Sequence, residues 1–84
     1  MEDEIRRVLK EHARLAVDVS ELGNDDDLFE AGMTSHANVN VMLALEEAFD
    51  VEFPEATLRR STFETISAIS ATLAQLTPAA DVAG

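Results

Sequence analysis

Apolar residues recur at steps of three and four along much of this 84-residue chain. This spacing places them on one face of an α-helix. A first helix is predicted from about Asp3 to Ala16, and its apolar stripe consists of Ile5, Val8, Leu9, His12 and Ala16. His12 is interpreted as a half-buried helix residue rather than a ligand, because no second histidine stands at ligand spacing. Alternation of period two does not persist beyond a few residues, so no strand is predicted.

A second helix is predicted from Ser35 to Phe49, with Thr34 as its N-cap because a threonine hydroxyl can accept from a first-turn N–H. One face carries the residues assigned to the core, which are Asn38, Val41, Met42, Leu45 and Phe49. The other face carries His36, Val39, Asn40, Leu43, Glu46 and Glu47. Since a surface helix needs only one apolar face, we interpret this second face as a docking surface. The alternative is that Val39 and Leu43 cover part of a neighbouring helix.

The connection between these helices runs from about Val17 to Met33. Its turn-forming run, residues 23–27, contains three consecutive aspartates without the ligand spacing of a calcium loop. The aspartates are therefore interpreted as a solvated loop, and no metal site is expected. A loop of this length is uncommon in a compact domain and is usually functional. Four of its apolar residues are predicted to pin it to the core: Leu22, Leu28, Phe29 and Met33.

After Pro54 the pattern predicts one or two short turns between Ala56 and Arg60. The Ser-x-x-Glu pattern at residues 61–64 is typical of a capping box that opens a last helix. The stripe of that helix consists of Phe63, Ile66, Ile69, Leu73 and Leu76. The predicted fold is an all-α four-helix bundle with a long first loop and a short third helix. It forms one domain over residues 1–76, and residues 77–84 form a flexible tail.

Charge is distributed unevenly along the chain. The net charge is −11, and all six basic residues lie outside the interval from Leu15 to Leu58. That interval contains eleven acidic residues and Ser35. Such a field repels nucleic acid and attracts basic protein surfaces. Cysteine is absent, no run of 18 apolar residues occurs, and residues 1–4 are acidic rather than basic. We therefore expect a cytoplasmic monomer without a membrane span or secretory signal.

Ser35 is the strongest candidate for chemistry. It stands where a loop gives way to a helical pattern, beside backbone N–H groups that have no partner within a helix. The helix dipole adds partial positive charge there, which favours an attached phosphate. A serine hydrolase is rejected because His36 is its immediate neighbour. Consecutive helical residues point about 100° apart, so His36 cannot easily act as its base.

Two runs, Glu30–Ala37 and Leu45–Pro54, resemble the acyl carrier protein family. In that family a Gly-x-Asp-Ser-Leu motif carries 4′-phosphopantetheine on its serine, and the following helix ends in a similar Leu-Glu-Glu-x-Phe run. The resemblance implies that Ser35 receives this arm from a phosphopantetheinyl transferase. The arm then holds a cargo as a thioester for a downstream acceptor enzyme, and the chain itself is not an enzyme. Thr34 and His36 replace the usual aspartate and leucine of this motif.

Residues 33–37 look more like the small stand-alone carriers that accept amino acids from synthetase-like ligases. We therefore predict an aminoacyl carrier whose cargo is a small amino acid. An ammonium group is costly to bury, so this cargo should stay on the surface near Asn38, without a long-chain pocket. One alternative is a fatty-acyl or polyketide carrier. A more distant one is an unmodified acidic adaptor that binds a basic partner.

Overall fold

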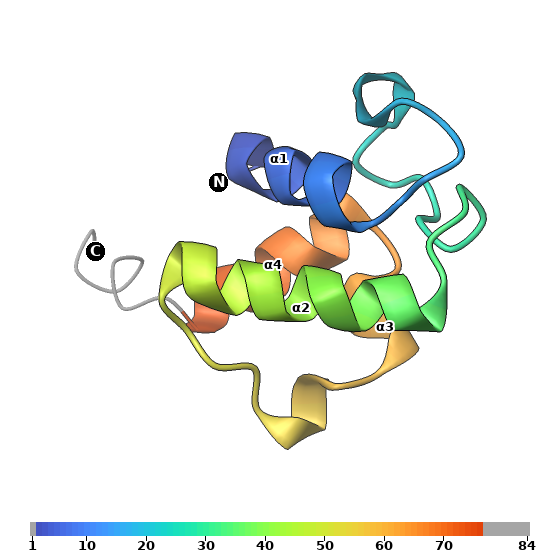
Figure 1. Cartoon of the computed structure of the whole chain (residues 1–84). Coiled ribbons are helices and arrows are strands. Elements are labelled where there is room, and N and C mark those ends of the chain that lie inside the picture. The colour runs from blue at the N-terminus through green and yellow to red at the C-terminus, as the bar shows by residue number, and fades with distance from the viewer. Residues whose placement is uncertain (1, 77–84) are drawn as a thin grey trace.

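Six helical segments follow one another along residues 2–76, the part of the chain that the computed structural model describes (Figure 1). They are α1 (Glu2–His12), η1 (Val19–Glu21), α2 (Ser35–Phe49), η2 (Glu55–Thr57), α3 (Arg60–Phe63) and α4 (Ile66–Leu76). These residues contain no strand, and the predicted all-α class with four α-helices, a long first loop and a short third helix is confirmed. The predicted tail, residues 77–84, lies outside the described residues.

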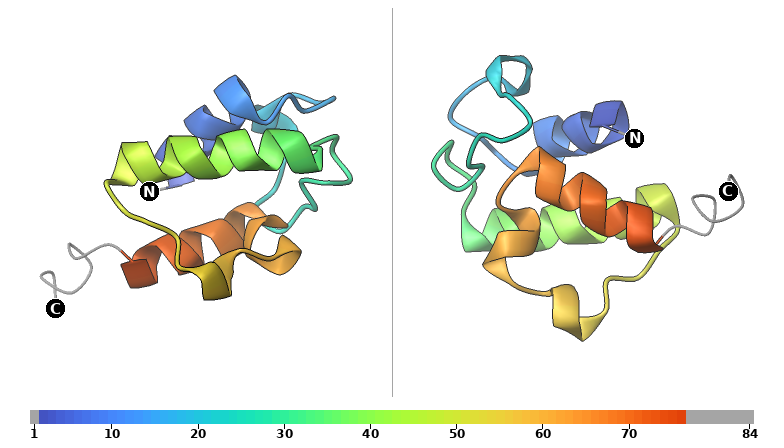
Figure 2. Two further views of the ribbon diagram at one scale, coloured as in Figure 1. Left: turned by 60° about the horizontal axis from the view of Figure 1, so that its bottom comes forward. Right: turned by 180° about the vertical axis from the view of Figure 1, so that it is seen from behind.

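The three longer helices surround one aliphatic core. α1 packs against both α2 and α4, while α3 packs against α4. The chain between α2 and α4, which carries η2 and α3, lies along one side of the bundle (Figure 2). The largest fully buried side chains are Phe63, Ile5, Leu9, Leu28, Leu45, Ile66, Ile69, Leu73 and Val41. None of the described helices has the length and apolar character needed to cross a membrane.

The first helix is shorter than its pattern predicts. α1 ends at His12 rather than Ala16, and Arg14 follows with a left-handed backbone (φ 53°). The N–H of Ala16 instead donates to the carbonyl of Ala31, 2.9 Å away. The apolar periodicity did not reveal that α1 ends at His12. The residue with the left-handed backbone, Arg14, is neither a glycine nor a proline, so the sequence gives no sign that the helix stops there. His12 is half-buried, as predicted.

The predicted capping box is wrong. Ser61 lies inside α3, and the residue that caps α4 is Thr65, whose Oγ1 accepts from the N–H of Ala68 at 3.0 Å. Glu64 instead lies 3.6 Å from the Nε of Arg60. Phe63 is buried, as the stripe requires, but it belongs to α3. The short turn predicted at residues 56–60 is divided between η2 and the start of α3.

The long first connection is structured throughout. Leu28 and Met33 are buried, and Leu22 and Phe29 pack against the core, which confirms their predicted anchoring. The pattern missed η1, which buries Val19. Two of the three aspartates also stabilise the loop rather than merely being solvated. Asp26 Oδ2 accepts from the N–H of Gly23, and Asp27 Oδ1 accepts from the N–H of Phe29; both bonds measure 2.8 Å.

Candidate functional site

Ser35 is the first residue of α2 and is exposed. Thr34 is the N-cap, as predicted, and its Oγ1 accepts from the N–H of Ala37 at 3.0 Å. The carbonyl of Thr34 accepts from the N–H of Asn38 at 2.9 Å. The first-turn N–H groups nearest Ser35 thus remain available at the positive end of the helix dipole. An anion attached to the Ser35 hydroxyl would meet both favourable features.

Ser35 is held in place by the loop before it. Gly32 has a backbone φ of 119°, which L-residues rarely adopt. A Cβ at Gly32 would lie 2.8 Å from the backbone nitrogen of Ala16, so the segment that follows α1 leaves no room for a side chain. The N–H of Met33 donates to the carbonyl of Leu28 at 3.0 Å, and the N–H of Leu28 donates to the carbonyl of Glu64 at 2.7 Å. These contacts fix the start of α2 against the segment that follows α1 and against Glu64, the C-cap of α3.

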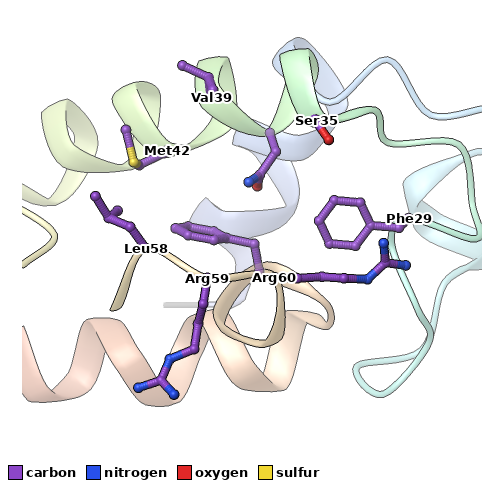
Figure 3. Close-up of a pocket in the computed structure, with 9 residues that line it drawn as sticks. Phe29, Ser35, Val39, Met42, Leu58, Arg59 and Arg60 are labelled. Carbon is purple, nitrogen blue, oxygen red and sulfur yellow. The ribbon is translucent and has the colours of Figure 1, made fainter. Parts of the chain in front are cut away.

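A cleft opens beside Ser35, between α2 and the segment that leads into α3 (Figure 3). We call it the Ser35 cleft, and its volume is about 360 Å³. Nine residues line it: Phe29, Ser35, Asn38, Val39, Met42, Leu58, Arg59, Arg60 and Phe63. Ser35, Phe29 and Arg60 lie at one end, and Met42 and Leu58 lie at the other. The cleft therefore begins at the serine and continues along α2 over a largely apolar surface.

Ser35 lies inside an acidic interval of the sequence, but the fold places basic residues near it. Arg59 and Arg60 both line the Ser35 cleft. The guanidinium carbon of Arg60 lies 4.3 Å from the centre of the Phe29 ring, a cation–π contact. The side chain of Arg59 points away from the cleft in Figure 3. Arg60, which contacts Phe29 and Glu64, thus places a positive charge at the serine end of the cleft, and its distance along the sequence concealed this.

The predicted docking residues on α2 do not form one uniform surface. His36, Val39, Asn40, Leu43 and Glu47 are exposed, with Val39 at 49% and Leu43 at 53%. Val39 borders the Ser35 cleft, whereas Leu43 and Glu47 border a second groove between α1 and α2. Glu46 is half-buried, and its Oε2 accepts from the N–H of Phe53 at 2.9 Å. Its carboxylate therefore stabilises the chain after α2, a contact that the helical pattern could not show.

Leu58 is an apolar surface residue that sequence reasoning missed. It is 49% exposed and lines the Ser35 cleft from the side opposite α2. No periodic pattern covers it, because it lies between η2 and α3. The available signal was a leucine four residues after Pro54, outside either helical stripe. Among the described residues, no group of three or more histidine or acidic side chains could hold a metal ion.

Asn38 provides a specific test of whether an arm on Ser35 would fit. Its Oδ1 is buried and has no hydrogen-bond partner among residues 2–76. It lies three residues after Ser35 and lines the same cleft, so the two side chains share one face of α2. Phosphopantetheine combines a phosphate, methylene and methyl groups, and amide N–H donors. The start of α2 suits the phosphate, and the apolar cleft suits the methylene and methyl groups, whereas the shielded Oδ1 of Asn38 is not open to the amides.

A family model for the phosphopantetheine attachment site matches residues 3–73 of the chain. The chain belongs to the family of carrier proteins that bear phosphopantetheine. The resemblance found from residues 30–37 and 45–54 is thereby confirmed, and it extends over nearly all of the described residues. Phosphopantetheine is the prosthetic group of this carrier protein.

Relatives of this carrier protein are known from sequence and structure. It is 42% identical to an aminoacyl carrier protein from Agrobacterium fabrum over 69 residues, which cover 82% of this chain and 83% of the relative. It is 41% identical to a carrier protein from Agrobacterium tumefaciens, crystallised with AMP and an engineered Bradyrhizobium japonicum glycine:[carrier protein] ligase. That comparison has a TM-score of 0.85 and covers 87% of this chain and 97% of the other.

A third relative is known from a solution structure. A protein from Agrobacterium tumefaciens is 40% identical to this carrier protein, with a TM-score of 0.73 over 89% of this chain and 90% of the other. All three relatives exceed the identity at which similarity indicates more than a shared fold. The predicted aminoacyl subgroup is therefore supported by relatives that match most of the chain.

Proposed function

We propose that Ser35 carries 4′-phosphopantetheine and that the chain delivers an amino acid, loaded by an amino acid:[carrier protein] ligase. The observation that carries this proposal is the exposed Ser35 at the capped start of α2, within a matched phosphopantetheine attachment domain. Ser35 is the one serine among the nine residues of the Ser35 cleft. The aminoacyl cargo is supported by the 42% identical aminoacyl carrier protein and by the relative solved with a glycine ligase.

The arm, when bound, supplies a terminal thiol that holds the amino acid as an activated thioester. The residues of the chain contribute attachment and orientation. The first turn of α2 stabilises the phosphate charge through its N–H groups and dipole. Three separate enzymes make and break the covalent bonds: a phosphopantetheinyl transferase, the ligase and a downstream acceptor enzyme. None of the nine residues that line the Ser35 cleft has an imidazole or carboxylate that could act as a base beside Ser35.

The docking surface is proposed to be the exposed face of α2. Val39 and Leu43 supply apolar contacts, and Glu47 supplies a negative charge for a basic partner surface. His36 and Asn40 add polar groups beside the attachment site. Interface-rim charges mainly raise the association rate and make it sensitive to salt. Glu46 is one of the docking residues predicted from the sequence. Because its carboxylate accepts from the N–H of Phe53, we assign it only a minor part at the edge of the docking surface.

The lining of the Ser35 cleft favours a cargo held outside it. Two arginines and no carboxylate line the cleft, so the ammonium group of an aminoacyl cargo would find no partner of opposite charge there. A fatty-acyl chain is the second candidate, because the cleft exists and much of its surface is apolar. Octanoyl and glycyl forms of the loaded protein distinguish the two. A clear rise in the unfolding midpoint with octanoyl but not glycyl would favour the fatty-acyl function.

Attachment is tested by intact mass after incubation with coenzyme A and a broad-specificity transferase. The wild-type chain should gain the mass of one arm, and Ser35→Ala should gain none. Ser61→Ala is the matched control, because Ser61 is also exposed but lies in α3. A mass gain on Ser35→Ala, or none on the wild type with any transferase, would refute the site. The absence of modification would favour the unmodified adaptor.

A further inference from the structure

Arg60 is a cation at the serine end of the Ser35 cleft to which the proposed function gives no part in attachment. Its guanidinium carbon lies 4.3 Å from the centre of the Phe29 ring, and its Nε lies 3.6 Å from Glu64 Oε2, beyond hydrogen-bond distance. No hydrogen bond joins the guanidinium to any of residues 2–76, so its N–H donors remain open. Two contacts therefore place this group without using its capacity to bind an anion.

The contacts of Arg60 belong to the segments that hold Ser35 in place. Phe29 lies in the connection that leads into the serine, and its ring packs against the core. The neighbouring Leu28 donates from its N–H to the carbonyl of Glu64 at 2.7 Å. Figure 3 shows the guanidinium of Arg60 at the same end of the cleft as Ser35. The fold therefore couples the position of this charge to the position of the attachment residue.

A cation here matters because the arm adds a negative charge to an already acidic protein. The net charge is −11, and eleven acidic residues lie between Leu15 and Leu58. A phosphodiester on Ser35 would enter that field, which opposes a further negative charge. The start of α2 offsets part of this cost through its N–H groups and dipole. A guanidinium with open donors is suited to offset more of it, because its geometry matches that of phosphate oxygens.

We propose that Arg60 is the counter-charge of the phosphodiester on Ser35. This inference rests on the proposed attachment at Ser35. It concerns the phosphate at the point of attachment and assigns no place to the rest of the arm. The side chain of Arg60 is 62% exposed, so the ion pair is a weak one that salt screens. Its effect is to favour the modified form of the protein over a form in which the added charge has no partner.

The test compares unmodified and arm-bearing forms of four proteins: wild type, Arg60→Gln, Arg59→Gln and Glu64→Gln. Arg59→Gln is the matched control, because it removes the same charge from a neighbouring arginine whose side chain points away from the cleft (Figure 3). Glu64→Gln removes the ion pair of Arg60 and keeps the guanidinium. Intact mass first establishes that each protein carries the arm.

The quantity measured is the change in the unfolding midpoint when the arm is attached. At low salt this change should be lower in Arg60→Gln than in the wild type by about 1–8 °C, the shift that one exposed ion pair gives a domain of this size. Arg59→Gln and Glu64→Gln should keep the wild-type change. Because two forms of one protein are compared, a general loss of stability in a variant cancels. At about 0.5 M salt the difference between wild type and Arg60→Gln should shrink.

A second measurement needs no variant and follows the guanidinium directly. The Nε–H signal of Arg60 should shift in NMR spectra of the wild type when the arm is attached, and the corresponding signal of Arg59 should not. A role of Arg60 in stability alone would leave its Nε–H signal unmoved by attachment.

The outcomes separate this inference from the proposed function. An equal change of midpoint in wild type and Arg60→Gln, or an Arg60 signal that does not move, would overturn the counter-charge and leave attachment intact. An equal loss in Glu64→Gln would assign the effect to the ion pair within the protein, and an equal loss in Arg59→Gln would assign it to net charge. Either result would also overturn the counter-charge. Failure of the wild type to gain mass would instead refute attachment at Ser35 and this inference with it.

Discussion

The two connections that flank α2 are held to the molecule in different ways. The first connection, residues 13–34, is tied to distant elements by several hydrogen bonds. Arg6 donates to the carbonyl of Val19 and to Asn24 Oδ1, both at 2.8 Å, and the N–H of Ser67 donates to the carbonyl of Asn24 at 2.9 Å. Together with the buried Leu28, these contacts fix the first connection to α1 and to the start of α4.

The second connection, residues 50–59, is held by fewer contacts. Its one bond to a distant side chain is from the N–H of Phe53 to Glu46, and Phe53 is its one buried residue. The bonds of Thr57 and Leu58 are local, to Pro54 and Glu55. Segments with few buried contacts open at low free-energy cost. The wall of the Ser35 cleft that bears the serine is therefore fixed, and the facing wall at Leu58 yields more easily.

The largest expected effect compares one leucine in each connection. Leu28→Ala should lower the free energy of unfolding by about 2–5 kcal/mol, because it leaves a cavity in the core. Leu58→Ala removes the same atoms from a half-exposed position and should cost less than about 1 kcal/mol. Urea denaturation of both variants measures the difference. Equal losses would show that the second connection is as firmly packed as the first.

The next effect concerns the backbone that leads into Ser35. Gly32→Ala should destabilise the fold by about 1–3 kcal/mol, because it forces a side chain against Ala16 at a left-handed φ. Gly23→Ala in the same connection is the control, since its Cβ would make only ordinary contacts, the nearest at 3.6 Å. Arm attachment should also slow in Gly32→Ala. Wild-type stability in Gly32→Ala would contradict the conclusion that the first connection holds Ser35 rigidly.

A smaller effect separates two neighbouring glutamates. Glu46→Ala should cost about 1 kcal/mol, because it removes the bond that anchors Phe53. Glu47→Ala should change stability by less than about 0.5 kcal/mol, as for most surface substitutions. For the rate of loading by the ligase at low salt, the opposite order is expected: Glu47→Ala should be loaded more slowly than Glu46→Ala. If Glu46→Ala leaves unfolding unchanged, the second connection is anchored in another way.

The smallest effect is the pH dependence of the cap of η1. The backbone N–H and the hydroxyl of Ser20 both donate to Asp18 Oδ1 at 2.9 Å, and these bonds lower the pKa of Asp18 below its usual value. Because the folded-state pKa is depressed, the stabilisation is present above the unfolded-state pKa, about 3.9, and is lost as the pH falls through the folded value. A carboxyl-carbon NMR titration should place the Asp18 midpoint below about 3.9. Asp18→Asn should retain the cap and lose this pH dependence.

The sequence alone determined the helical class and the bounds of α2, and it made Ser35 the candidate attachment residue. These features depend on local signals: a 3.6-residue apolar period, a threonine cap and a motif within a few residues of the serine. Local periodicity failed at helix ends, as at Ala16 and Ser61. There the backbone conformation of Arg14 and the cap supplied by Thr65 decided the boundary, and neither leaves a mark in the apolar pattern.

Only the tertiary structure decided what surrounds Ser35. Arg60 stands 25 positions away along the chain, yet packing of α3 beside the first connection brings its charge to the serine end of the cleft. Tertiary structure also decides that Glu46 accepts from the N–H of Phe53 in the second connection. The contacts of a residue depend on which segments pack against one another, and long-range packing determines this. Local sequence signals therefore pointed to Ser35 as the proposed attachment residue, while the fold built the cleft beside it.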